Sequence, residues 1–170
     1  MNRDVLLRLL YVLTSAAVLG LDQATKLMVV SRLTLHSTLP VVPGFLHLTL
    51  VFNRGALFGL FHGMADPWRS TLFTVVPLGA IAIVLVFQYR TTLHDPLTQG
   101  GLALILGGAA GNLADRVRLG YVVDFLDVFI GEHHWPAFNV ADSAICCGVG
   151  LLVLDLLLTG RRPEQVREAA

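Results

Sequence analysis

Four apolar stretches, each flanked by polar residues, set the kind of fold that this sequence can adopt. A helix needs about 20 residues to cross the hydrocarbon of a bilayer. Each stretch approaches that length once the polar residues at its ends are included. The sequence therefore predicts an all-α membrane fold in which four helices span the bilayer. The predicted spans cover residues 5–25, 69–89, 98–115 and 140–159.

The composition agrees with a membrane protein and argues against an ordinary soluble enzyme. Of the 170 residues, 55% are hydrophobic and only 14% are charged, whereas soluble domains typically have about 45–50% and about 25%. A soluble fold of this size would have too little interior to bury so much apolar surface. Because a chain of this length usually forms one domain, we predict a single polytopic membrane domain over residues 1–170.

The charged residues and the cysteines bear on further classes of function. Twelve Lys and Arg balance twelve Asp and Glu, so no basic surplus points to a nucleic-acid partner. The two cysteines, Cys146 and Cys147, are adjacent in an apolar run. Neighbouring cysteines rarely form an unstrained disulfide, and we expect both to be small buried residues of a helix.

The link between the first two predicted spans, residues 31–68, differs from the rest of the chain. Its segment Phe45–Phe52 partly alternates in polarity and is rich in residues that favour strands. Pro43 and Gly44 precede this segment as turn formers. We therefore predict a small β-platform here, followed by a glycine-rich segment from Gly55 to Gly63.

The distribution of cations bears on the orientation in the membrane, because cytoplasmic loops carry an excess of Lys and Arg. An even number of spans puts both termini on one side, and each side then carries six cations. The pair Arg161 and Arg162 near the C-terminus lies away from any motif and favours cytoplasmic termini. The two long links, and with them the β-platform, are then extracytoplasmic.

Polar residues gather at the ends of the predicted spans, where ionisable groups are costly and usually functional. Asp22 and Lys26 lie four residues apart on one helix face and could pair, although such a pair can also simply anchor a helix end. Asn112, Asp115 and Arg116 follow one another at i, i+3 and i+4. Their side chains therefore face one way, like the wall of a site.

Small and turn-forming residues accompany these polar groups. Gly107 and Gly111, with Gly108 between them, form a pattern that allows two membrane helices to approach closely. Asn53 leaves the predicted strand into a glycine turn, a position where asparagine often serves only to form the turn.

Two carboxylates, Asp124 and Asp142, are the main candidates for chemistry. Asp124 is flanked by strongly apolar residues, and Asp142 opens the last span with Asn139 three residues earlier on the same face. The loop between the two carboxylates could bring both to one face of the membrane. Two carboxylates a few ångströms apart share a proton. One can then deprotonate a water while the other donates to a substrate carbonyl, which is the chemistry of an aspartic peptidase.

Motifs for other hydrolytic mechanisms are missing from the sequence. It contains no H-E-x-x-H for a zinc site and no G-x-S-x-G for a serine nucleophile. His133 and His134 follow Glu132, but adjacent histidines point apart on regular elements, which favours an ordinary loop. We therefore expect neither a metal nor another cofactor.

Five motifs taken together resemble lipoprotein signal peptidase, the type II signal peptidase family of bacteria. Each motif is short, but the set runs in the order of the family and covers most of the chain. The motifs are Asp22-Gln-Ala-Thr-Lys26, Asn53-x-Gly55-x-x-Phe58-Gly59, Gly107-Gly-x-x-Gly-Asn112-x-x-Asp115-Arg116, Val123-Asp124-Phe125 and Phe138-Asn139-x-Ala141-Asp142.

The resemblance implies an aspartic endopeptidase of the bacterial inner membrane, with its active site towards the outer face. Such enzymes remove the signal peptide from a prolipoprotein, cutting just before a cysteine that already carries diacylglycerol. The expected partners are this precursor and membrane lipid, and a monomer is expected. The implied catalytic pair is Asp124 and Asp142. The implied supporting or substrate-binding residues are Asn53, Asn112, Arg116, Asn139, Asp115, Asp22, Lys26 and Gly108.

Two other classes of function remain open on the residues alone. Carboxylates in a membrane could relay protons in a small proton-coupled transporter, although these carboxylates cluster at one face and the spans show no pair of repeats. A membrane phosphatase could use Arg116 and the histidines to bind phosphate. Processing of a diacylglyceryl-modified precursor in the presence of a chelator separates these classes.

Overall fold

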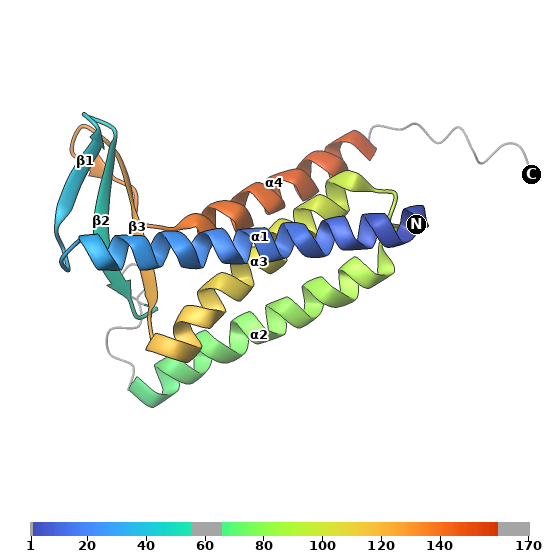
Figure 1. The fold of residues 1–170 in the computed structure, drawn as a ribbon, viewed down its shortest axis with the longest axis horizontal. Coiled ribbons are helices and arrows are strands. Elements are labelled where there is room, and N and C mark those ends of the chain that lie inside the picture. Colours follow the sequence, from blue (N-terminus) through green and yellow to red (C-terminus); the bar gives the residue numbers. More distant parts are fainter. Residues whose placement is uncertain (1, 56–65, 160–170) are drawn as a thin grey trace, which may run out of the picture.

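Long helices form a bundle with a small β-sheet at one end (Figure 1). The computed structural model describes residues 2–55 and 66–159. The N-terminus lies at the end of the bundle away from the sheet. In chain order the elements are α1 (Arg3–Arg32), β1 (Thr38–Val42), β2 (Leu46–Asn53), α2 (Asp66–Arg90), α3 (Pro96–Leu119), β3 (Val122–Ile130), β4 (His133–His134) and α4 (Val140–Thr159).

Helix α3 begins and ends at residues whose chemistry suits a helix terminus. The Asp95 side chain accepts a hydrogen bond from the backbone N–H of Thr98, and Pro96 takes the first helical position, where a proline loses no hydrogen bond. Gly120 ends the helix in the left-handed conformation, with a φ of +78°, which glycine adopts without steric cost. The helix therefore extends beyond the predicted span of 98–115 at both ends.

Helix α1 also extends further than the predicted span of 5–25, because it continues to Arg32. Its last turns still present one face to the protein, since Asp22, Lys26 and Val29 are buried there. These residues follow one another at spacings of four and three, which places them on one side of a helix. Helix α4 has the same bounds as its predicted span of 140–159.

Helix α3 lies in the middle of the bundle and packs against α1, α2 and α4. Two adjacent glycines allow its close approach to two neighbours. A Cβ atom on Gly107 would lie 2.6 Å from the carbonyl oxygen of Ser15 on α1. A Cβ atom on Gly108 would collide with the carbonyl oxygen of Ala141 on α4. Gly111, which forms the predicted glycine pattern with Gly107, is also closely packed, since a Cβ atom on it would lie 2.6 Å from Oδ2 of Asp22 on α1.

The sheet is antiparallel, with strand order β1-β2-β3-β4. Leu50 on β2 and Val123 and Phe125 on β3 form its buried core together with Val29 at the end of α1. A small sheet was predicted within the link of residues 31–68, and β1 and β2 lie there. The structure adds β3 and β4, which come from the link between α3 and α4. Strand β3 is what brings Asp124 next to the end of β2, where Asn53 lies.

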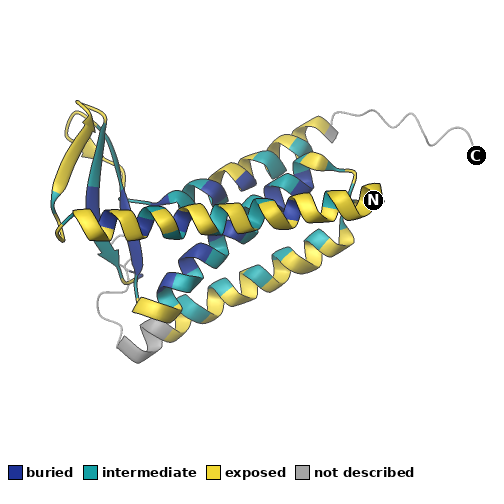
Figure 2. Cartoon of the chain, viewed as in Figure 1, coloured by how far each residue is buried: buried dark blue, intermediate teal, exposed yellow. Residues whose placement is uncertain are grey.

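Three of the described helices are long and apolar enough to cross a membrane: Arg3–Arg32, Thr71–Arg90 and Val140–Leu158. Their outward faces are exposed, whereas buried residues line α3 (Figure 2). Helix α3 carries buried polar side chains, among them Gln99, Asn112 and Asp115. A helix surrounded by other helices can hold polar groups that a lipid-facing helix cannot. The predicted span of 98–115, which lies in α3, therefore differs in character from the other three.

The prediction that Cys146 and Cys147 are buried is wrong. Both lie in α4 as free cysteines and both are exposed. The apolar run around them suits the outer surface of a membrane helix, where hydrophobic side chains face lipid instead of a protein core.

Candidate active site

The predicted carboxylates come together where α3, α4 and the sheet meet. Asp124 lies on β3 opposite Val51 of β2 and is 2% exposed. Its Oδ1 atom accepts a hydrogen bond from Nδ2 of Asn139 over 2.7 Å. Its Oδ2 atom accepts one from Nδ2 of Asn53 over 3.0 Å. Both oxygens of this buried carboxylate are therefore held by amide donors.

Asp142 lies in the first turn of α4, and its two oxygens are also held. Oδ1 accepts a hydrogen bond from Nδ2 of Asn112 over 2.7 Å, and Oδ2 accepts one from the backbone N–H of Asn139 over 3.2 Å. In return, Oδ1 of Asn139 accepts the backbone N–H of Asp142 over 2.9 Å. This reciprocal pair caps the start of α4 as a capping box does. The need to satisfy the free N–H groups at a helix start thus fixes Asp142 next to Asn139.

Asn139 and Asn112 connect the two carboxylates into one network. The Nδ2 group of Asn139, which donates to Asp124, also donates to Oδ1 of Asn112 over 3.1 Å. Asn112 in turn donates to Asp142. Asn139 is fully buried and Asn112 is 7% exposed. A buried network holds its members in one arrangement only when every polar group has a hydrogen-bond partner. The side-chain amides of Asn112 and Asn139 both meet this condition.

The environment of Asp124 favours its protonated form. Burial raises the pKa of Asp124 from 3.8 to about 6, and the negative charge of Asp142 acts in the same direction. The hydrogen bonds from Asn53 and Asn139 and the positive charge of Lys26 oppose this rise. A carboxyl group whose pKa is raised beside a second carboxylate can serve as a proton donor.

Asn53 and Arg116 lie beside this pair. They line one small recess with Phe73, Thr74 and Tyr121. The Arg116 guanidinium lies 3.5 Å from the carbonyl oxygen of Asn112, and its charge interacts with Asp124 and Asp142. The side chain of Asn53 also accepts the N–H of Gly55 over 2.9 Å, so the predicted glycine turn forms after β2. The rest of the predicted glycine-rich segment lies outside the described residues.

Asp22, Lys26 and Asp115 form a second buried group next to the carboxylate pair. Lys26 Nζ lies 2.8 Å from an oxygen of Asp22 and 2.8 Å from an oxygen of Asp115. The predicted pairing of Asp22 with Lys26 is therefore present, and Asp115 joins it. Gly108, also a predicted site residue, contacts Ala141 of α4 instead of facing the carboxylates.

Sequence reasoning missed Gln23 as part of this second group. Its Nε2 group donates to Asp115 over 2.9 Å and to Asp22 over 3.2 Å, and its Oε1 accepts from Arg118 over 3.1 Å. Neighbouring residues on a helix point about 100° apart, so spacing alone gives no sign that Gln23 reaches the same carboxylates as Asp22. Only its place within the first motif could have pointed to it.

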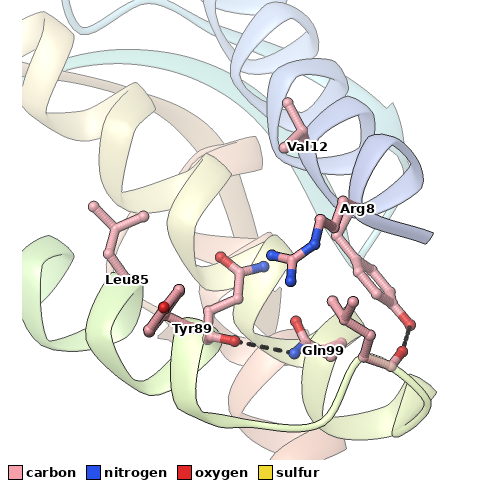
Figure 3. A pocket seen from close by; sticks show the side chains of 8 residues that line it. Arg8, Val12, Leu85, Tyr89 and Gln99 are labelled. Carbon is pink, nitrogen blue, oxygen red and sulfur yellow. Dashed lines mark hydrogen bonds between the residues drawn. The ribbon is translucent and has the colours of Figure 1, made fainter. Parts of the chain in front are cut away.

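A cavity of about 330 Å³ lies at the other end of the bundle, between α1, α2 and α3. Figure 3 shows Arg8 and Gln99 at its wall, with a hydrogen bond from Gln99 to the carbonyl oxygen of Gln88. Among the described residues that line this cavity, none is a carboxylate. Within the described ranges, no three His, Cys, Asp or Glu side chains are grouped so that they could hold a metal ion. The network around Asp124 and Asp142 is therefore the candidate active site.

Comparison with known proteins gives a consistent result. The family model for signal peptidase (SPase) II matches residues 14–158. A protein of Syntrophus aciditrophicus named lipoprotein signal peptidase is 46% identical over 149 residues, which cover 88% of this chain and 92% of that protein. A protein of the same name from Syntrophotalea carbinolica is 47% identical over 153 residues, with coverage of 89% and 93%.

The fold is also similar to that of a solved structure described as a bacterial membrane enzyme. The TM-score is 0.76 at 31% identity, and the match covers 86% of this chain and 92% of the other. A family match over most of the chain, relatives close in length and a shared fold agree with one another. The chain belongs to the signal peptidase II family.

Proposed function

We propose that this chain is an aspartic endopeptidase that removes the signal peptide from diacylglyceryl-modified prolipoproteins, cutting before the lipidated cysteine. Family membership supports the substrate class, because the relatives are named lipoprotein signal peptidase. The observation that carries the mechanism is the hydrogen-bond network joining Asp124 to Asp142 through Asn139 and Asn112. A pair of carboxylates held in this way is suited to acid–base chemistry on one water molecule.

The two carboxylates take different parts in the proposed reaction. Asp124 holds the shared proton, because its pKa is raised to about 6, and donates it to the carbonyl oxygen of the scissile bond. Asp142 takes a proton from the attacking water. Arg116 and Asn53, which line one recess beside the pair, supply donors to the oxyanion that develops.

The membrane contributes the positioning of the substrate in this proposal. The acyl chains of the precursor stay in the bilayer, so the scissile bond is held at the depth of the carboxylate pair. Holding a reactant in place lowers the entropic part of the barrier. The β-sheet then covers the peptide.

The proposed enzyme is a monomer in the bacterial inner membrane with both termini in the cytoplasm. Helix α3 acts as the fourth span, shielded from lipid by α1, α2 and α4. The sheet and the carboxylate pair then face the outer side, since they lie at the end of the bundle away from the N-terminus. A reporter fused to the C-terminus is expected to be active in the cytoplasm only, and periplasmic activity would contradict this orientation.

The test of the proposed reaction uses purified protein in detergent and a diacylglyceryl-modified precursor. The wild type is expected to release the signal peptide in the presence of a chelator. Asp124→Asn and Asp142→Asn are each expected to lose at least about 1,000-fold in kcat, because neither variant retains the pair. Full activity of either variant, or cleavage that a chelator abolishes, contradicts the mechanism. An unmodified precursor serves as the control for the requirement for lipid.

A further inference from the structure

Lys26 is a buried cation on α1 whose ammonium group makes three contacts. Its side chain is 4% exposed, and Nζ lies 2.8 Å from Oδ2 of Asp22 and 2.8 Å from Oδ2 of Asp115. Nζ also donates to Oδ1 of Asn112 over 3.0 Å. A lysine ammonium has three protons to donate. All of its donors are therefore directed at two carboxylates and one amide of the protein.

The two carboxylates that Lys26 bridges each hold the main chain next to an aspartate of the candidate site. Oδ1 of Asp22 accepts the backbone N–H of Ala141 over 2.9 Å, and Ala141 directly precedes Asp142. Oδ2 of Asp115 accepts the backbone N–H of Val123 over 3.1 Å, and Val123 directly precedes Asp124. One ammonium group therefore links the attachment points of α4 and of β3.

Lys26 also determines which way the amide of Asn112 is turned. Because an ammonium can only donate, the atom of Asn112 that faces it must be the oxygen. The Nδ2 group of Asn112 then faces Asp142, to which it donates over 2.7 Å. With the opposite orientation, the amide would present its oxygen to the carboxylate, and this hydrogen bond could not form.

Stability alone is a poor reason for this arrangement. Burying three charged groups costs desolvation energy that their attraction often does not recover, and apolar replacements are frequently as stable. A fixed geometry is a better reason, since catalysis is sensitive to small displacements of reacting groups, and a shift of about 1 Å can cost about 100-fold in rate.

We propose that Lys26 is a positioning residue of the peptidase: it joins the carboxylates that hold the main chain beside Asp124 and beside Asp142. This role rests on the catalytic assignment of the two aspartates made above. It predicts that removing the ammonium lowers the rate of the chemical step, while substrate binding changes little, because the Lys26 side chain is 4% exposed and its three donors are all taken by Asp22, Asp115 and Asn112.

The first test compares Lys26→Met with Lys26→Arg in the precursor-cleavage assay at a temperature well below melting. Lys26→Met is expected to lower kcat about 30- to 100-fold while KM changes less than about threefold. Lys26→Arg keeps the charge but not the three-fold geometry of the donors, so its kcat should lie between those of Lys26→Met and the wild type. A loss confined to KM, or equal kcat in both variants, overturns the proposal.

Lys26→Met leaves two buried carboxylates without a cation, so it can fail to fold. The triple variant Asp22→Asn/Lys26→Met/Asp115→Asn removes this problem, because no buried charge is left unpaired in the group. The asparagine oxygens can still accept the N–H groups of Ala141 and Val123. We expect this variant to fold and to keep at least a 10-fold reduction in kcat. A folded triple variant with kcat within about twofold of the wild type overturns the proposal.

A matched control removes a buried polar contact elsewhere between helices. Thr98→Val deletes the hydrogen bond from Thr98 Oγ1 on α3 to Asp155 on α4, which is 3.0 Å long. It should lower the melting temperature without changing kcat by more than about twofold. If Thr98→Val loses as much kcat as Lys26→Met at the same loss of melting temperature, the effect is general destabilisation and the positioning role is wrong.

The Asp124→Asn variant, measured in the same series, separates the two proposals. If Asp124→Asn is active, Asp124 and Asp142 are not a catalytic pair, and no residue is needed to position them. An inactive Asp124→Asn enzyme beside a fully active triple variant leaves the aspartic mechanism in place and contradicts only the role of Lys26.

Discussion

The side-chain amide of Asn139, the residue directly before helix α4, donates to Asp124 over 2.7 Å. The same residue exchanges two hydrogen bonds with Asp142, through its backbone N–H and its side-chain oxygen. One asparagine thus caps a helix and connects two carboxylates from different elements. These bonds use both the oxygen and the NH2 group of the side-chain amide. No other residue type of similar size offers such an acceptor and donor together.

Asn139→Ala should therefore lower kcat about 10- to 100-fold, because a buried oxygen of Asp124 is left without its donor. It should also lower the melting temperature, because α4 loses its cap. The precursor-cleavage assay and thermal unfolding in detergent measure the two effects. Asn2→Ala removes the cap of α1, where Asn2 accepts the N–H of Asp4, and should lower stability slightly with unchanged kcat. Equal kcat in both variants contradicts the role given to Asn139.

The pH dependence of the reaction should report the raised pKa of Asp124. If Asp124 must be protonated, kcat/KM falls at high pH with a limb near pH 6. Asn53→Ala removes a donor that stabilises the ionised form of Asp124, so its pKa rises and the limb should move up by as much as about one unit. A shift to lower pH, or no shift, contradicts the assignment.

The pH experiment needs a control at a residue outside the network of Asp124 and Asp142. His134 pairs with Asp127 at the far edge of the sheet, with Nδ1 2.8 Å from Oδ1. His134→Ala is expected to leave the limb unchanged. If the limb disappears in His134→Ala, its assignment to Asp124 is wrong.

Stability should also depend on pH through Asp124. Its pKa is raised from 3.8 to about 6 in the folded protein, so the ionised form is disfavoured by folding. This cost is absent below about pH 3.8 and grows until about pH 6, above which it is constant. The melting temperature of Asp124→Asn, relative to the wild type, should therefore rise between pH 4 and pH 6 and then level off. A difference that falls over this interval contradicts the direction of the pKa shift.

Close packing of α3 against α4 gives a matched pair of glycine substitutions. A Cβ at Gly108 collides with the main chain of Ala141, whereas a Cβ at Gly100 meets no atom within 4 Å. Gly108→Ala should lower stability by about 1–3 kcal/mol and reduce kcat, because Asp142 follows Ala141. Gly100→Ala should raise stability by about 0.5–1 kcal/mol, since alanine favours a helix. Thermal unfolding in detergent measures both, and a neutral Gly108→Ala contradicts the packing argument.

Spacing along the chain anticipated part of the site. Asn112, Asp115 and Arg116 were expected to face one way, and they do lie on one side of α3, but they serve different partners. Asn112 donates to Asp142, Asp115 accepts from Lys26, and Arg116 lines the recess with Asn53. A shared helix face follows from the period of the helix, whereas the partner of each side chain depends on which elements pack against that face.

The sequence by itself determined the membrane character of the chain, the bounds of α4 and the shared helix faces of Asn112 with Asp115 and of Asp22 with Lys26, because hydropathy and helical spacing are local properties. Tertiary structure alone decided that β3 joins the sheet, that α3 tolerates buried polar groups, and that Asn139 lies between Asp124 and Asp142. It also decided that Lys26 bridges Asp22 and Asp115, which are far apart in the chain. These contacts depend on which surfaces of the helices and strands pack together, and a local sequence pattern does not predict that packing.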